Sequence, residues 1–276
     1  MGVCVTRVPS YGMGKTRAKR RKKQRVQSAA RRKTAVAGRE FPDPRAVTAQ
    51  VTAMDGVPVD EETFIFAVEP IRLDGGDVLM FQSPHVPPFY LLTAKAFRDT
   101  AEPQRIEALN RTSRETDGSL RPLDAAGAFD ALEGLAVAVI LSAAAIEAHA
   151  NDMIRRLPED ASVTVKRKNV EIVFERESME RALYLEEKIT LVGPMLNGGK
   201  SIKGTVAWEA YRRVVPLRNE LLHMKSRAQN DPDEPGPFGL LMRGEGSRAP
   251  EDAAMLIHAV EPDWIPNRVR AELGIS

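Results

Sequence analysis

Three polar residues in the second half of the chain have the types and spacing of a site for phosphate-ester chemistry. Arg218 and Asn219 are adjacent, and His223 follows four residues later in the segment RNELLH. In a helix, Asn219 and His223 lie on one face, one turn apart. An imidazole exchanges protons near neutral pH, and a guanidinium offers planar donors that match phosphate oxygens. Together they suit attack of an RNA 2′-hydroxyl on its neighbouring phosphate.

The segments that carry this chemistry place two charges on apolar faces. Arg218 lies in the apolar stripe of a helix predicted over 205–227, and Glu147 lies in an apolar row of a helix predicted over 125–157. A charge on an apolar face is costly unless a partner offsets its desolvation. We therefore expect Glu147 and Arg218 to approach each other in or beside the core. The stripe consists of Trp208, Tyr211, Val215 and Leu222, and the row consists of Ala136, Ile140, Ala143, Ala150 and Ile154.

Further cations on the 205–227 helix would attract a phosphate backbone, because they displace its counterions. These predicted RNA-binding residues are Arg212, Arg213, Lys225 and Arg227. The chemistry needs no metal, and the four histidines have no metal-ligand spacing, so we expect neither a metal nor another cofactor. His149 lies on a different helix face from Glu147, and we expect it to be partly exposed.

Charge is distributed unevenly along the 276 residues, whose net charge is +2. Residues 1–39 contain 13 Lys and Arg and no Asp or Glu, which leaves 27 basic and 38 acidic residues, a net charge of −11, in the rest. Residues 1–40 are therefore predicted to be a disordered basic arm. Its role stays open between a nucleic-acid arm, a solvated tail and an extension upstream of a start at Met13.

Cysteine usage and hydropathy predict a cytoplasmic protein with no membrane partner. The single cysteine, Cys4, excludes a disulfide within the chain and fits a reducing compartment. The N-terminus lacks the apolar segment of a secretory signal peptide. The longest apolar run, residues 134–146, is too short to cross a bilayer and is typical of a buried helix.

Hydrophobic periodicity divides the rest of the chain into two regions. Residues 41–120 are predicted to be a small mixed lobe or linker region, in which the strands TFIFAV and DVLMFQ flank a turn at 74–76. Residues 121–276 are predicted to be a helical domain with a β-hairpin, SVTVKRKNVEIVF, inserted between its first two helices. The predicted fold class is therefore mainly α. The helices are expected over 125–157, over 176–196 with fraying at Gly193 and Pro194, over 205–227, and from Ala249 onwards.

The segment RNELLH and its context resemble HEPN domains (higher eukaryote and prokaryote nucleotide-binding). LSAAAIEAHANDMI resembles the first long helix of such domains, and VAWEAYRRVVPLRNELLH resembles their motif helix, in which an aromatic residue precedes the Arg-Asn pair. The resemblance covers about 125–265 and leaves 1–120 unexplained. The hairpin departs from a plain bundle, and Pro216 is expected to kink or break the motif helix.

The resemblance implies a helical bundle that dimerises through the motif helix and cleaves RNA without a metal, leaving a 2′,3′-cyclic phosphate. Under it, Arg218 stabilises the phosphate, Asn219 positions the site, His223 is a general acid or base, and Glu147 matches the acidic position of the first helix. Family analogy adds an antitoxin as a partner in a defence or stress system. Two alternatives stay open: a non-catalytic RNA-binding or protein-interaction module, and a scaffold in which Arg218 and His223 satisfy polar groups of the core.

Overall fold

The computed structural model describes residues 2–5, 47–50, 53–54, 57–58, 64–116, 118–223, 235–262 and 264–275. The chain divides into two compact units, Met1–Pro84 and His85–Ser276. Apart from 2–5, the predicted basic arm lies outside the described residues, and so do Lys225 and Arg227.

The first unit is a small antiparallel β structure. Its longest strand, β5, pairs with three others, β1, β2 and β6. The turn between β5 and β6 closes with a hydrogen bond from Leu73 N to Asp77 O of 2.8 Å, and Gly76 takes the positive φ of 89° that favours glycine. This confirms the predicted pair of strands and their turn. The strands are β1 (Gly2–Val5), β2 (Val47–Gln50), β3 (Ala53–Met54), β4 (Val57–Pro58), β5 (Phe64–Arg72) and β6 (Val78–Ser83).

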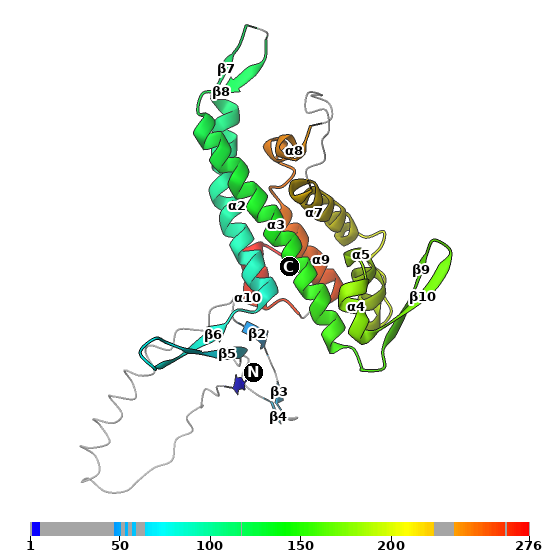
Figure 1. Cartoon of the computed structure of the whole chain (residues 1–276). Helices are drawn as coiled ribbons and strands as arrows, with labels where there is room; N and C mark the ends of the chain where they lie inside the picture. Colours follow the sequence, from blue (N-terminus) through cyan, green and yellow to red (C-terminus); the bar gives the residue numbers. More distant parts are fainter. Residues whose placement is uncertain are drawn as a thin grey trace, which may run out of the picture. The chain divides into compact units, whose positions relative to one another are not determined.

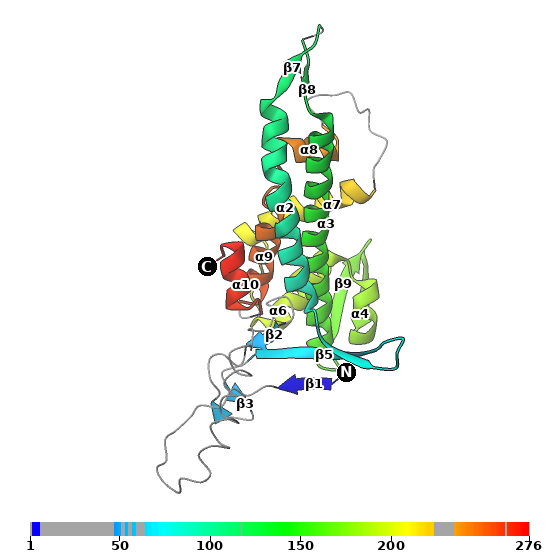
Figure 2. The ribbon, with the colours of Figure 1, turned by 90° about the vertical axis from the view of Figure 1, so that its left-hand side faces the viewer.

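The second unit is mainly α, as predicted. Two long antiparallel helices, α2 and α3, lie side by side, and α7 and α9 pack against α3 (Figure 1, Figure 2). The short hairpin of β7 and β8 joins α2 to α3. These elements are α2 (Val86–Asn110), β7 (Thr112–Arg114), β8 (Leu120–Pro122), α3 (Ala125–Arg156), α7 (Val206–Leu222), α8 (Pro237–Arg243), α9 (Ala249–Val260) and α10 (Asn267–Leu273).

The helix α2 belongs with the helical unit, which therefore begins at His85 rather than at the predicted boundary near 121. Its small residues allow a close approach to α3: a Cβ added to Gly134 of α3 would lie 2.7 Å from the Cβ of Ala101. The buried face of α2 includes Leu91, Ala94 and Ala108, but Phe97, Ile106 and Leu109 are exposed, so its sequence has no single apolar stripe.

The core of the second unit forms around α3, which is long and apolar enough to cross a membrane by length and composition alone. Here it packs against α2, α7 and α9 and buries residues along most of its length. Asp124 starts α3, because its Oδ1 accepts a hydrogen bond of 2.9 Å from Gly127 N. Large side chains with almost no exposure include Leu91, Leu135, Ile146, Met153, Leu256 and Ile257.

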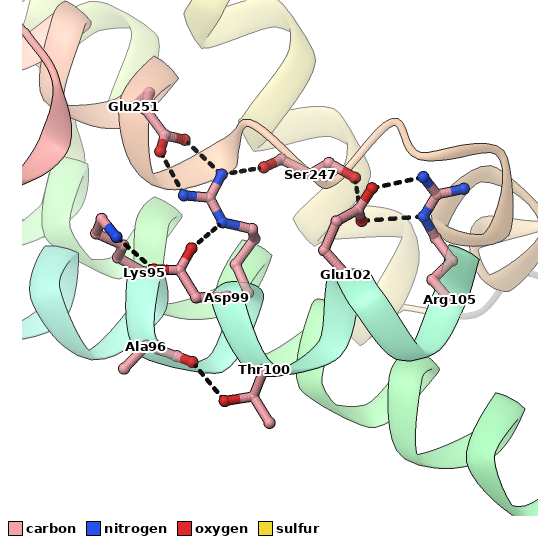
Figure 3. Close-up of polar contacts among 9 residues, drawn as sticks. Lys95, Ala96, Asp99, Thr100, Glu102, Arg105, Ser247 and Glu251 are labelled. Atoms are coloured by element: carbon pink, nitrogen blue, oxygen red, sulfur yellow. Dashed lines mark hydrogen bonds and ion pairs between the residues drawn. The ribbon is translucent and has the colours of Figure 1, made fainter. Parts of the chain in front are cut away.

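A polar network attaches α2 to the start of α9 (Figure 3). The guanidinium of Arg98 binds both carboxylate oxygens of Glu251, at 2.6 and 3.2 Å, and also donates to the backbone oxygen of Ser247 at 2.6 Å. One turn further along α2, Glu102 accepts hydrogen bonds from Arg105 and from the Ser247 hydroxyl. Because these groups are partly buried, their pairing satisfies polar atoms that the helix contact removes from water.

The predicted hairpin insertion is confirmed. Strands β9 (Ser162–Arg167) and β10 (Val170–Glu175) pair antiparallel in a continuous register. The two connecting residues, Lys168 and Asn169, have positive φ values of 48° and 67°. Positive φ at both central positions is the pattern of a two-residue turn that matches the twist of a hairpin.

The helix predicted over 176–196 is broken into four pieces. These are α4 (Arg176–Ala182), α5 (Leu185–Glu187), the π-helical turn η1 (Lys188–Val192) and α6 (Gly193–Leu196). The break lies at Leu183 and Tyr184, which are extended, and the Tyr184 N–H donates to the Glu187 carboxylate at 2.7 Å. The predicted fraying point starts α6 instead, because proline is well tolerated in the first turn of a helix.

Candidate functional site

The helix α7 presents a buried face and a solvent face. Its N-terminus is capped by the Thr205 hydroxyl, which accepts from Trp208 N at 3.3 Å, and the helix continues through Pro216. Burial declines after Leu217, so the last turn is open to solvent and the prediction of a buried Leu222 is wrong. The buried residues are Ala207, Ala210, Tyr211, Val214, Val215 and Leu217.

The predicted approach of Glu147 and Arg218 is confirmed. Arg218 Nη2 lies 3.7 Å from Glu147 Oε2, and the two side chains are 30% and 48% exposed. Arg218 Nη1 also donates to Asn219 Oδ1 at 3.0 Å. The pair therefore lies beside the core, where a carboxylate and an amide hold the guanidinium on the rim of α7.

These residues line a cleft of about 620 Å³. One wall comes from α7 and contributes Arg218 and Asn219, and another comes from the segment at α5. The volume is within the usual range for small-molecule sites. The cleft thus brings together three of the four residues predicted to form the site. Its lining residues are Glu147, Tyr184, Leu185, Glu186, Glu187, Tyr211, Val215, Arg218 and Asn219.

The fourth predicted residue, His223, caps the C-terminal end of α7 and is exposed. Its backbone N–H donates to Asn219 O at 2.9 Å. An exposed stripe runs along α7 at helical spacing through Arg212, Pro216, Asn219 and His223. The imidazole is therefore open to a ligand or to a second molecule on the same side of the helix as Asn219.

A second cation, which sequence reasoning missed, lies near Glu147. Lys188 of η1 is buried, and its Nζ donates to Asn151 Oδ1 and to Glu180 O, each at 2.7 Å. Burial lowers the pKa of this lysine, while the carboxylates of Glu147 and Glu180 oppose that effect. Lys188 lies in the π-helical turn with its side chain buried, and no pattern in the sequence predicted that turn.

Two tyrosines, also missed, give the cleft an aromatic character. Tyr184 lies in the break between α4 and α5, and Tyr211 belongs to the buried face of α7. Burial, with a smaller contribution from Glu186, raises the pKa of Tyr211 to about 12. Its phenol therefore stays neutral at physiological pH and can donate a hydrogen bond.

The cations predicted to bind RNA have different environments. Arg213 donates to both carboxylate oxygens of Asp252 in α9, at 2.7 and 2.8 Å, and Asp252 is 3% exposed. Arg212 is exposed and lies 3.4 Å from Glu209 one turn earlier. The guanidinium of Arg213 thus joins α7 to α9, whereas Arg212 faces solvent on the stripe that includes His223.

His149 is 2% exposed, so the prediction of partial exposure is wrong. Its ring packs edge-on against Trp264 with 4.4 Å between centroids, and its Nε2 lies 4.0 Å from Glu261 Oε2. Neither ring nitrogen has a hydrogen-bond partner among the described residues. Burial, together with the positive charge of Arg156 and the nearby His85, lowers the pKa of His149 to about 3.

Among the described residues, no three His, Cys, Asp or Glu side chains gather as metal ligands would. Compared with protein families, curated proteins and solved structures, the chain matches none of them. The geometry of the cleft and of α7 is therefore the basis for proposing a function.

Proposed function

We propose that the chain is a metal-independent endoribonuclease of HEPN type, with its site on α7. The observation that carries the proposal is the arrangement of Arg218, Asn219 and His223. The first two line a cleft, and the third is exposed one turn beyond them. A cation and an amide can stabilise the phosphate, and an accessible imidazole can exchange the protons, when a 2′-hydroxyl attacks that phosphate and the 5′-oxygen leaves.

Each residue has a distinct role in this proposal. Arg218 binds the scissile phosphate and stabilises the charge that develops on it, because a guanidinium matches two phosphate oxygens. His223 exchanges the protons of the attacking and leaving oxygens. Asn219 holds Arg218 through its side-chain oxygen at 3.0 Å, and Glu147 orients the guanidinium from α3.

The exposed stripe of α7 is the proposed contact between two copies of the chain. A two-fold axis beside this stripe would bring both His223 residues to one shared site, since an isologous contact uses the same surface on each subunit. Arg212 and Pro216 lie on this stripe between the two ends of the helix. An antitoxin that covers the stripe, in a cytoplasmic defence or stress system, is the corresponding proposal for a partner.

A second candidate is a non-catalytic binding module with the same cleft. It is favoured by Glu147, because this carboxylate lies 3.7 Å from Arg218 and competes with a phosphate for that guanidinium. The exposure of His223 argues against the third interpretation, a scaffold in which that imidazole satisfies a core group.

The test is cleavage of single-stranded RNA in excess EDTA by the wild type and three variants. We expect His223→Ala and Arg218→Ala each to lower the rate at least about 100-fold, because general acid–base and electrostatic contributions are of that size. His258→Gln is the matched control, since it removes an imidazole from α9 and should cleave at the wild-type rate. Circular dichroism of each variant separates loss of activity from loss of fold.

Two results would contradict the proposal. If the wild type binds RNAs of several sequences but leaves them intact, the binding module is favoured. Equal cleavage by wild type and His223→Ala would assign the activity to another site or another protein.

A further inference from the structure

Tyr184 is an aromatic side chain fixed at the edge of the cleft. Although it lines the cleft, 67% of it is exposed. The guanidinium carbon of Arg167 lies 4.3 Å from the centre of its ring. One face of the phenol is therefore covered by a cation, while most of the residue remains open to solvent.

The inserted hairpin holds this arrangement in place. Arg167 ends strand β9, forms an ion pair with Glu187 and donates to Ala182 O at 2.9 Å. Its guanidinium also lies 5.2 Å from the ring of Phe174 on β10. Since the backbone of Tyr184 is bonded to the same Glu187 carboxylate, the ring is ordered before any ligand arrives. An ordered aromatic surface binds a flat ligand at little cost in entropy.

The two walls of the cleft present different groups. Glu186 and Glu187 lie next to Tyr184 on the α5 side, whereas Arg218 and Asn219 lie on the α7 side. The two carboxylates are already paired, Glu186 with Lys203 and Glu187 with Arg167, so the cation that the lining of the cleft offers to a phosphate is Arg218 on the α7 side. A nucleobase suits the α5 side, because its ring stacks on a phenol and its N–H groups can donate to the carboxylate of Glu186, which is 50% exposed.

We propose that Tyr184 is the stacking platform for one unpaired nucleobase of a single-stranded RNA whose phosphate lies at Arg218. The inference depends on the proposed function for the phosphate end, and it adds the class of substrate. A base inside a duplex is stacked on both faces and cannot offer one of them to Tyr184. The substrate is therefore RNA that is single-stranded at the bound nucleotide, and duplex RNA is excluded.

The test measures binding of a labelled single-stranded RNA by fluorescence anisotropy, in the His223→Ala background and at one fixed salt concentration. We expect Tyr184→Leu to weaken binding about 5- to 100-fold, as base–aromatic stacking does when it is lost. Tyr184→Phe keeps the ring and should bind within about two-fold of the parent. Phe129→Leu is the matched control, because Phe129 is 70% exposed but lies outside the lining of the cleft.

Three further kinds of ligand test where and how the base binds. A scan that replaces one nucleotide at a time by an abasic one should find a position at which the parent and Tyr184→Leu bind equally. The same sequence in a duplex should bind the parent more weakly than the single strand. Free adenosine monophosphate distinguishes a pocket for one nucleotide from a site on a strand, and we expect it to bind more weakly than the oligonucleotide.

Several outcomes would overturn the inference. These are equal binding by the parent and Tyr184→Leu, equal binding of duplex and single strand, no binding of either RNA, or tighter binding of the free mononucleotide. The result is separable from the proposed activity. Binding that depends on Tyr184 without cleavage by the wild type keeps the platform and contradicts the ribonuclease, whereas cleavage unaffected by Tyr184→Leu does the reverse.

Discussion

Arg218 of α7 and Glu147 of α3 form an ion pair across the edge of the cleft, with 3.7 Å between Nη2 and Oε2. Both side chains are partly exposed, so the pair contributes little to folding. Measured energies for exposed ion pairs are about 0.2–1 kcal/mol. Its effect is to fix the direction of a guanidinium that would otherwise move freely on a helix rim.

Glu147→Gln should therefore impair function more than stability. We expect the free energy of unfolding to fall by less than about 1 kcal/mol, while kcat/KM for RNA cleavage falls about ten-fold because the guanidinium is less ordered. Urea denaturation and steady-state kinetics measure the two effects. A variant that loses several kcal/mol of stability, or that cleaves like the wild type, would contradict an orienting role.

The two neighbouring arginines of α7 should behave differently. Arg213→Gln leaves the buried Asp252 carboxylate without its bidentate partner, and we expect the free energy of unfolding to fall by about 1–3 kcal/mol. Arg212→Gln, the matched control on the same helix, should change it by less than about 0.5 kcal/mol. Urea denaturation of both variants is the measurement. Equal stability of the two would remove the structural role given to Arg213.

His149 should make the fold sensitive to acid. Its pKa is about 3 in the folded chain and about 6.5 in the unfolded chain, so between these values the unfolded state binds the extra proton. The neutral His149 thus gives its full contribution to the free energy of unfolding above pH 6.5. Below pH 6.5 that free energy falls by up to about 1.4 kcal/mol per pH unit.

Urea denaturation at pH 7, 6 and 5 tests this. The variant His149→Leu, which does not titrate, should lose stability less steeply than the wild type over that range. Phe129→Leu, which changes an exposed residue with no titratable group, should follow the wild-type slope. Parallel pH profiles for the wild type and His149→Leu would show that another group controls the acid response.

The close packing of α2 on α3 can be tested with one substitution that disturbs it and a second that relieves the disturbance. A Cβ at position 134 would lie 2.7 Å from the Cβ of Ala101, so we expect Gly134→Ala to destabilise the fold by about 1–3 kcal/mol despite its better helix propensity. Adding Ala101→Gly removes the clash and should restore part of the loss. The melting temperatures of the wild type, the single variant and the double variant measure both effects. A stabilised single variant would mean that the helices separate easily.

Sequence reasoning located the elements whose signals are local. The apolar rows of 125–157 and 205–227 each contained one misplaced charge, and these charges became the Glu147–Arg218 pair. Alternation on either side of the central KRKN was sufficient to predict the hairpin, and the structure places its turn at Lys168 and Asn169. Helix α9 begins at Ala249 as predicted.

The features that were missed depend on tertiary contacts. Neither Leu183 nor Tyr184 is a helix-breaking residue, and the Glu187 carboxylate that accepts from the Tyr184 N–H is itself paired with Arg167 of the hairpin. His149 is buried because Trp264, more than a hundred residues later, covers its ring. The platform at Tyr184 depends on Arg167 from the hairpin, and no spacing within either segment predicts that contact.

The ends of a cleaved RNA show whether α7 directs attack by a 2′-hydroxyl, because that attack leaves a cyclic phosphate. A single-stranded RNA is incubated with the wild-type protein in excess EDTA, and the products are analysed by mass spectrometry. We expect 2′,3′-cyclic phosphate ends, and no cleavage where one 2′-deoxynucleotide replaces the nucleotide before the scissile bond. Products with 3′-hydroxyl ends, or cleavage that persists at the 2′-deoxy position, would contradict this mechanism.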